Sequence, residues 1–143
     1  MNPFEFVVEG PPISLQTRNR GNLQAWKAKV LNSARLKWPN TDSPLTEENL
    51  KLTVTYYYED VYPDVDNIIK PIQDALVGLV YNNDSQISDT RSKRRNINAS
   101  FRVKGMSPVL AQGFVLNKEF LHVKIEHDSN QEVLEWQKKS RVR

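Results

Sequence analysis

Hydrophobic and polar residues alternate in four parts of the chain with the spacing of β-strands. The alternation covers residues 4–9, 50–58, 97–103 and 121–125, and it is clearest in "LKLTVTYYY" at 50–58. A period of two places every second side chain on one buried face. The pattern therefore predicts four strands, and Gly10, Pro11 and Pro12 are expected to end the first of them.

Two other segments have the spacing of helices. Residues 22–37 place Leu23, Trp26, Val30 and Ala34 on one side, and Pro39 stops this helix. A second helix is expected to begin near Asn67. Its apolar side would contain Ile69, Ile72, Leu76 and Leu79.

The ends of the helices also have sequence signals. Either Asp66 or Asn67 is expected to cap the second helix, and Pro71 is tolerated because it falls in the first turn. Residues 81–84 are typical of a turn. Ser107 and Pro108 have the pattern of a cap followed by a first-turn proline. A last helix is expected around 133–137.

These elements interleave without a regular βαβ repeat. We therefore expect an α+β fold with a single compact domain, in which a mixed β-sheet packs against helices. The domain would span residues 1–128, and residues 129–143 would form a polar, basic C-terminal segment.

Composition narrows the class of protein only a little. The 143 residues are 38% hydrophobic, enough for one core, and carry a net charge of +3 that is compatible with a polyanionic partner. Cysteine is absent, which excludes disulfides and thiolate metal sites. The start of the chain lacks a signal-peptide pattern and no stretch approaches membrane-spanning length. A cytoplasmic protein without membrane contact is expected.

Candidate chemistry centres on "YPDVDNIIKPIQDAL", residues 62–76. Asp64 and Asp66 are one position apart, and two carboxylates about 4 Å apart repel by roughly 4 kcal/mol at an intermediate dielectric. Protonation of one of them would relieve this repulsion. A hard divalent cation such as Mg²⁺ does so better, because it prefers oxygen ligands. Asp84 offers a third carboxylate if the chain returns to the same end of the sheet, and Lys70 would add a cation near a phosphodiester.

A purely structural alternative stays open for these residues. Asp66 and Lys70 have the spacing of a helix ion pair, and so do Lys70 and Asp74. Exposed pairs of this kind contribute only a few tenths of a kcal/mol. A calcium loop of the EF-hand type does not fit, because Ile68 and Ile69 stand where oxygen ligands are required.

Basic residues provide a second candidate site. "RSKRR" at 91–95 has four cations in five positions, and other basic residues fall in the loop before the first helix and on that helix. Such residues could hold DNA phosphates, although a solvated strand face is the simpler explanation for any one of them. The candidates for DNA contact are Arg18, Arg20, Lys27, Arg91, Lys93, Arg94 and Arg95.

The segment "YPDVDNIIKPIQDALVGLVYNNDSQI" resembles the signature of the RusA family of crossover junction endodeoxyribonucleases, often encoded by phages and prophages. The similarity lies in the Asp-x-Asp-Asn pair, the lysine four residues after the second aspartate, "DAL", and the acid before "SQI". "FVVEGPPISLQ" resembles the family's opening strand and loop. "SFRVKGMSPVLAQGF" resembles a segment of some phage members.

The resemblance implies a small homodimer in a bacterial host cell that binds four-way DNA junctions (Holliday junctions) and cuts two opposed strands with Mg²⁺, for which Mn²⁺ could substitute. Asp64, Asp66 and Asp84 would hold the metal, and Lys70 would be the catalytic lysine. Family members often have adjacent acids in the turn, whereas this chain has Asn83-Asp84, so Asp89 competes for the role of third acid. The segment 96–117 is longer than the corresponding part of the compact family core.

Two other functions remain possible at this point. One is a noncatalytic protein that binds branched DNA. The other is a related metal nuclease that acts on flaps, forks or duplex DNA. A junction resolvase is the preferred hypothesis, and its dimer would present two equivalent sites to a nearly twofold substrate.

Overall fold

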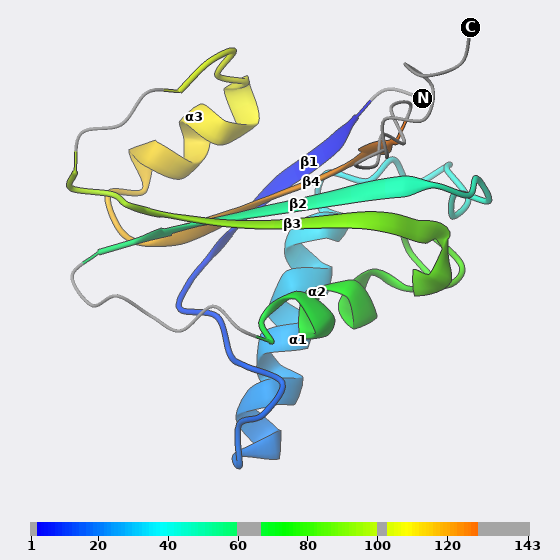
Figure 1. Ribbon diagram of the computed structural model, residues 1–143, viewed down its shortest axis with the longest axis horizontal. Coiled ribbons are helices and arrows are strands. Elements are labelled where there is room, and N and C mark those ends of the chain that lie inside the picture. Colours follow the sequence, from blue (N-terminus) through cyan, green and yellow to red (C-terminus); the bar gives the residue numbers. More distant parts are fainter. Residues whose placement is uncertain (1–2, 60–66, 100–102, 129–143) are drawn as a thin grey trace, which may run out of the picture.

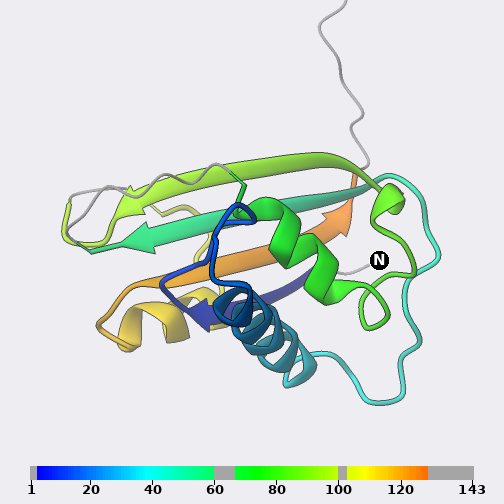
Figure 2. The same ribbon diagram turned by 90° about the horizontal axis from the view of Figure 1, so that it is seen from below.

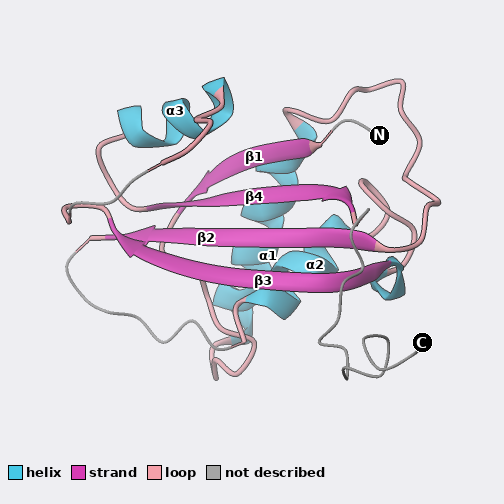
Figure 3. Cartoon of the chain, turned by 45° about the horizontal axis from the view of Figure 1, so that its top comes forward, coloured by secondary structure: helices cyan, strands magenta, loops and turns pink. Residues whose placement is uncertain are grey.

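A mixed β-sheet forms the centre of the molecule (Figure 1). The structure is a computed structural model and describes residues 3–59, 67–99 and 103–128. Within them the strand order is β1-β4-β2-β3, with β1 at Phe4–Glu9, β2 at Leu50–Tyr58, β3 at Ile87–Asn96 and β4 at Phe120–His127. β4 is antiparallel to both neighbours, whereas β2 and β3 run parallel, as Figure 3 shows.

Helices lie on both sides of this sheet. α1 (Arg20–Arg35) and α2 (Ile69–Leu76) cover one face, and α3 (Pro108–Val115) lies on the other (Figures 1 and 2). A short 3₁₀ helix, η1 (Asp84–Gln86), leads into β3. α2 and η1 thus belong to the crossover between two parallel strands, which needs a connection of this length.

The main core lies between the sheet and the pair α1 and α2. The side chains that α1 buries are the four that the helical spacing predicts, Leu23, Trp26, Val30 and Ala34. Trp26, Val30 and Ala34 belong to one cluster with alternate residues of the central strands, among them Leu52, Val54, Val123 and Ile125. Full burial of such a side chain contributes about 1.5–3 kcal/mol, so this layer fixes the position of α2 against the sheet.

A smaller apolar cluster holds α3 to the other face. Ser107 caps the helix by accepting from the Leu110 amide, and Pro108 follows in the first turn as predicted. Leu110 packs with Tyr57 and Phe120. Gly113 lies against the Phe120 ring so closely that a Cβ there would overlap it.

The structure corrects three sequence predictions. Residues 97–99 form a turn and Val103 has no strand structure, so the strand predicted at 97–103 is wrong for the described residues; the strand in this region is β3. Ile97 and Val103 are apolar because they pack against the α3 cluster. β3 was missed because its side chains are mostly exposed on both faces, which leaves no alternation of apolar residues to detect.

The other two corrections concern α2. Asn67 does not cap the helix: it has a positive φ of 66°, its carbonyl accepts from the Leu15 amide, and the N-cap is Ile68 without a side-chain bond. The helix also ends at Leu76, before Leu79, and Gly78 follows with a φ of 92°. Among the other predictions, Asp64, Asp66, the helix at 133–137 and the segment 129–143 lie outside the described residues.

The described part of the chain contains no helix that is both long and apolar enough to cross a membrane. The fold expected from the sequence, an α+β domain with a mixed sheet and packed helices, is confirmed.

Candidate active site

Lys70 and Asp84, two of the predicted catalytic residues, are in direct contact. The Lys70 Nζ lies 2.5 Å from Asp84 Oδ2 and 3.0 Å from Asp74 Oδ1. Lys70 and Asp74 are one turn apart on α2, whereas Asp84 comes from η1, fourteen residues after Lys70. The ammonium therefore joins the first turn of α2 to the turn that precedes β3.

Gln86 holds the turn that carries Asp84. Its side-chain oxygen accepts from the Asn82 and Asn83 amides, both at 2.9 Å, and its amide nitrogen donates to the Leu45 and Glu47 carbonyls at 2.9 and 2.8 Å. The side chain is buried and every polar atom in it is used. Asp84 thus projects from a turn whose backbone is fixed at both sides.

The loop before α1 lies against the start of α2. The Leu15 amide donates to the Asn67 carbonyl at 2.9 Å, and Arg20 donates from Nη1 to the Leu15 carbonyl at 2.9 Å. Farther along α1, Lys27 Nζ is 3.7 Å from Asp74 Oδ2. Two of the predicted DNA-contacting cations, Arg20 and Lys27, are therefore placed on the α2 side of the sheet, and Arg18 belongs to the same loop.

The basic run on β3 is divided between the two faces of the sheet. Arg94 pairs with Tyr56, whose side chain belongs to the core beside α1 and α2. Arg91, Lys93 and Arg95 point the other way, because side chains alternate along a strand. The structure therefore does not gather all four cations beside Lys70; three of them are on the opposite face.

Asp89, the alternative third acid, also lies on that opposite face. It pairs with Lys51 in the sheet, and its Oδ2 accepts from Arg91 Nε at 3.3 Å. Asp84, not Asp89, is the acid that the fold brings to Lys70.

The charges around Lys70 influence one another. The hydrogen bond to Asp84 and then the one to Asp74 raise the pKa of Lys70, so the side chain is a cation at neutral pH. Burial raises the pKa of the nearby Tyr81 hydroxyl, and the Asp84 and Asp74 charges raise it further. Lys70 thus offers positive charge, and Tyr81 stays a neutral donor to the Gln73 carbonyl at 2.8 Å.

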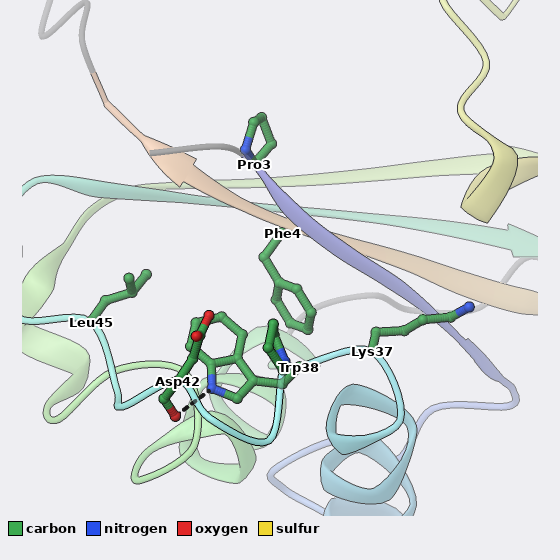
Figure 4. Close-up of a pocket in the computed structure, with 7 residues that line it drawn as sticks. Pro3, Phe4, Lys37, Trp38, Asp42 and Leu45 are labelled. Atoms are coloured by element: carbon green, nitrogen blue, oxygen red, sulfur yellow. Dashed lines mark hydrogen bonds between the residues drawn. The ribbon is translucent and has the colours of Figure 1, made fainter.

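A pocket of about 380 Å³ lies elsewhere, at the end of α1 (Figure 4). Phe4 and Trp38 form its apolar wall, and Trp38 donates from its indole Nε1 to the Asp42 carbonyl at 3.4 Å. None of the predicted site residues lines it. Trp38 is buried, as Trp26 is, which agrees with a core role for both side chains.

The described residues contain no group of three or more acids and histidines close enough to bind a metal ion. Asp64 and Asp66, the other two predicted ligands, lie outside those residues. The proposed three-carboxylate site thus stays a prediction, and its described member is Asp84.

The fold therefore combines a mixed β-sheet with a contact between a lysine on the crossover helix α2 and an aspartate in the turn before β3. The sequence profile of the family described as Endodeoxyribonuclease RusA matches residues 14–104, which include α1, β2, α2 and β3. A protein named crossover junction endodeoxyribonuclease rusA, from Lactococcus phage r1t, is 31% identical over 114 residues, covering 65% of this chain and 87% of that protein.

The chain belongs to the RusA endodeoxyribonuclease family and is a DNA-cleaving hydrolase. This confirms the resemblance seen in residues 62–87 and the expectation of an enzyme. The noncatalytic alternative does not fit this assignment.

Sequence reasoning assigned no role to Gln86. The signal was available, because Asn83 and Gln86 have the spacing of a capping box and both of its hydrogen bonds are present. Asp74 was considered only as a surface partner of Lys70. Its second contact, with Lys27 of α1, depends on how the two helices pack, which no local pattern reveals.

Proposed function

We propose that this chain resolves four-way DNA junctions by cutting two opposed strands, with a divalent cation as cofactor. The observation that carries the proposal is the contact between Lys70 and Asp84 in a chain of an endodeoxyribonuclease family. The name of the phage relative supports a crossover junction as the substrate.

The chemistry of Asp84 fits an ion-binding role. Its carboxylate is 31% exposed and already faces a cation, the Lys70 ammonium. Hard divalent ions take such oxygen ligands, so Asp84 would hold Mg²⁺ or Mn²⁺ together with Asp64 and Asp66. When bound, the ion would supply Lewis-acid stabilisation of the phosphodiester and a water of lowered pKa.

Lys70 would contribute electrostatic stabilisation to the same reaction. Its charge would act on the negative charge that develops on a phosphodiester bound through an ion at Asp84, and preorganised charge is an effective way to lower a barrier. Asp74 gives the ammonium a second acceptor at 3.0 Å. Lys70 thus keeps an anchor on its own helix when Asp84 binds an ion.

The cations on the α1 side would position the cleaved strand. Lys27 contacts Asp74 on the helix that carries Lys70. Arg20 donates to the Leu15 carbonyl, and the Leu15 amide donates to Asn67 just before that helix. Phosphate contacts set the register of DNA on a protein without reading its sequence. With Arg18 in the same loop, these residues form a part of the predicted DNA set that lies on the same side of the sheet as Lys70.

Cleavage of a synthetic four-way junction tests the proposal. Purified protein should produce two symmetric cuts with Mg²⁺ and few or none without a divalent ion. Asp66→Asn should abolish cutting but retain junction binding, because one carboxylate of the metal site is lost while the DNA contacts remain.

Asp89→Asn is the matched control, since it removes one acid on the other face of the sheet and should leave cutting intact. Normal cutting by Asp66→Asn would show that the catalytic assignment is wrong. Faster cutting of flaps, forks or linear duplex than of junctions would replace the junction with that substrate.

A further inference from the structure

The face of the sheet opposite α1 and α2 carries cations from three strands, Lys51 on β2, Arg91 and Lys93 on β3, and Lys124 on β4. Residues that pair in a ladder point to the same side, and Thr53 of β2 pairs with Arg91 of β3 and with Lys124 of β4. In the next row, Thr55 pairs with Lys93 and with His122. We call the patch formed by Lys51, Thr53, Thr55, Arg91, Lys93 and Lys124 the open face.

α3 covers only one end of this side of the sheet. It packs over Tyr57 and Phe120, beyond the row of Thr55. Figures 1 and 2 show α1 and α2 on the other side. At the β1 end of the two rows, Val7 packs with the α3 cluster and Glu5 accepts from Ser107, the cap of α3. Among the described residues, the β2 and β3 ends of the rows, at Thr53, Thr55, Arg91 and Lys93, are not part of that cluster.

Acids on the same side of the sheet neutralise the open face only in part. Asp89 pairs with Arg91, and Glu5 accepts from Ser107 and contacts His122, at 2.6 and 2.7 Å. Two further acids lie on this side of the sheet: Glu126 is across from Lys51, and Glu9, which pairs with Phe120, forms an ion pair with Lys118 at 3.3 Å. No ion pair within the described chain involves Lys51, Lys93 or Lys124. Lys51 has an acid on each side in the ladder and Lys124 lies beside Glu5, whereas the row of Lys93 contains no acid, so Lys93 is the cation most available to an external partner.

We infer that the open face binds the phosphate backbone of DNA, and that this DNA is a different segment from the one cleaved. The inference rests on the proposed function. Lys70 and Asp84 are associated with α2, on the other side of the sheet. A branched substrate has several arms, so one arm at Lys70 leaves another to contact the open face. β3 is an edge strand, and its Arg94 faces the α2 side, so the cations of β3 lie on both faces of this edge of the sheet.

DNA is a better occupant than a second copy of this chain. Near a twofold axis a residue meets its own counterpart, so Arg91 and Lys93 would approach like charges there. Phosphates complement these cations, and the hydroxyls of Thr53 and Thr55 between them are suitable phosphate donors.

The test compares two charge-matched double variants in DNA binding without divalent ions, so that cleavage does not interfere. Lys93→Gln with Lys124→Gln alters the open face. Lys29→Gln with Arg35→Gln removes the same charge from α1. Affinities for a four-way junction and for a short linear duplex are measured over a range of salt concentrations.

The open-face variant should lose about tenfold in junction affinity, and its salt slope should fall by roughly 2, about 0.9 for each phosphate contact removed. Its affinity for the short duplex should change much less. The α1 variant should affect both DNAs to a similar extent. If the double variant does not fold, Lys93→Gln alone, on the exposed edge strand, should lower the slope by roughly 1.

An unchanged junction affinity and slope in the open-face variant would overturn the inference. So would loss of a wild-type dimer in sedimentation, because the face would then join two copies of the chain. The proposed function fails separately, if the wild type binds junctions through this face but never cuts them.

Discussion

At Lys70, one ammonium is shared by two carboxylates that reach it from different elements. Asp74 belongs to the same helix, and Asp84 to the turn before β3. With the Lys70 side chain 47% exposed and both acids 31% exposed, solvent screens the pairs, and they contribute at most about 1 kcal/mol to stability. The two ion pairs therefore matter chiefly because they fix the position of the Lys70 ammonium.

Asp74→Asn tests this positioning role. We expect turnover on a four-way junction to fall about tenfold, which corresponds to about 1.4 kcal/mol in the barrier, because Lys70 loses its anchor on α2. Junction affinity and melting temperature should stay close to wild type. Asp74→Glu keeps the charge and should restore part of the turnover. An equal loss in both variants would argue against a positioning role.

Glu5 links the sheet to α3 and gives stability a defined dependence on pH. Burial is the largest single influence and acts to raise the pKa of Glu5, but the hydrogen bonds from Ser107 and His122 and the electrostatic attraction of His122 and Lys124 together outweigh it, and the pKa falls below its ordinary value of 4.5. A carboxyl with a lowered pKa in the folded state stabilises the fold above its unfolded-state pKa. That contribution is lost as the pH falls through the folded-state value.

Glu5→Gln should remove this dependence. Above pH 4.5 the variant should be less stable than wild type, and the difference should shrink as the pH falls below that value. Denaturant unfolding at a series of pH values measures it. A difference that stays constant with pH would show that Glu5 acts through packing and not through its charge.

At the scale of elements, the turn 82–86 shows how a buried polar side chain positions a catalytic candidate. Gln86 bonds two amides of its own turn and two carbonyls of the 45–47 segment. The loss of this side chain would leave buried polar groups without partners, each costing about 1–3 kcal/mol.

We therefore expect Gln86→Leu to destabilise the protein by more than about 2 kcal/mol and to lower cleavage under conditions where the variant stays folded. Gln24→Leu, on the exposed side of α1, is the control and should change stability by less than about 0.5 kcal/mol. Chemical denaturation and junction cleavage measure the two effects. Wild-type cleavage by folded Gln86→Leu would mean that the turn does not position Asp84.

The helices and strands that could be predicted from the sequence are those that bury one side against the core. α1 and β2 each have one buried side, so their apolar residues recur with the period of the element, and both were predicted. β3 lies at the edge of the sheet and exposes most side chains, so its strand structure comes from pairing with β2 and leaves no such trace. The N-cap of α2 was missed because Leu15, distant in sequence, holds Asn67 in place.

For the whole molecule, the proposed symmetric cutting requires a homodimer with one site in each chain. Mixed dimers of wild-type and Asp66→Asn chains test this directly. A dimer with one active site should nick one strand and accumulate the nicked junction, whereas the wild type releases two linear products. Sedimentation gives the oligomeric state, and gel analysis of both strands gives the cuts. Full resolution by purified mixed dimers would show that two sites are not needed.

By itself, the sequence determined the class of fold, the core side of α1, and the set Asp64, Asp66, Lys70 and Asp84 whose spacing resembles the RusA signature. These properties follow from local periodicity and from residues close together in the chain. Only the tertiary structure decided that Asp84 and not Asp89 meets Lys70, that Asp74 shares its charge, and that the basic run on β3 is divided between two faces. Such contacts depend on how the crossover packs and on the register between β2 and β3, which are set by burial across the whole domain.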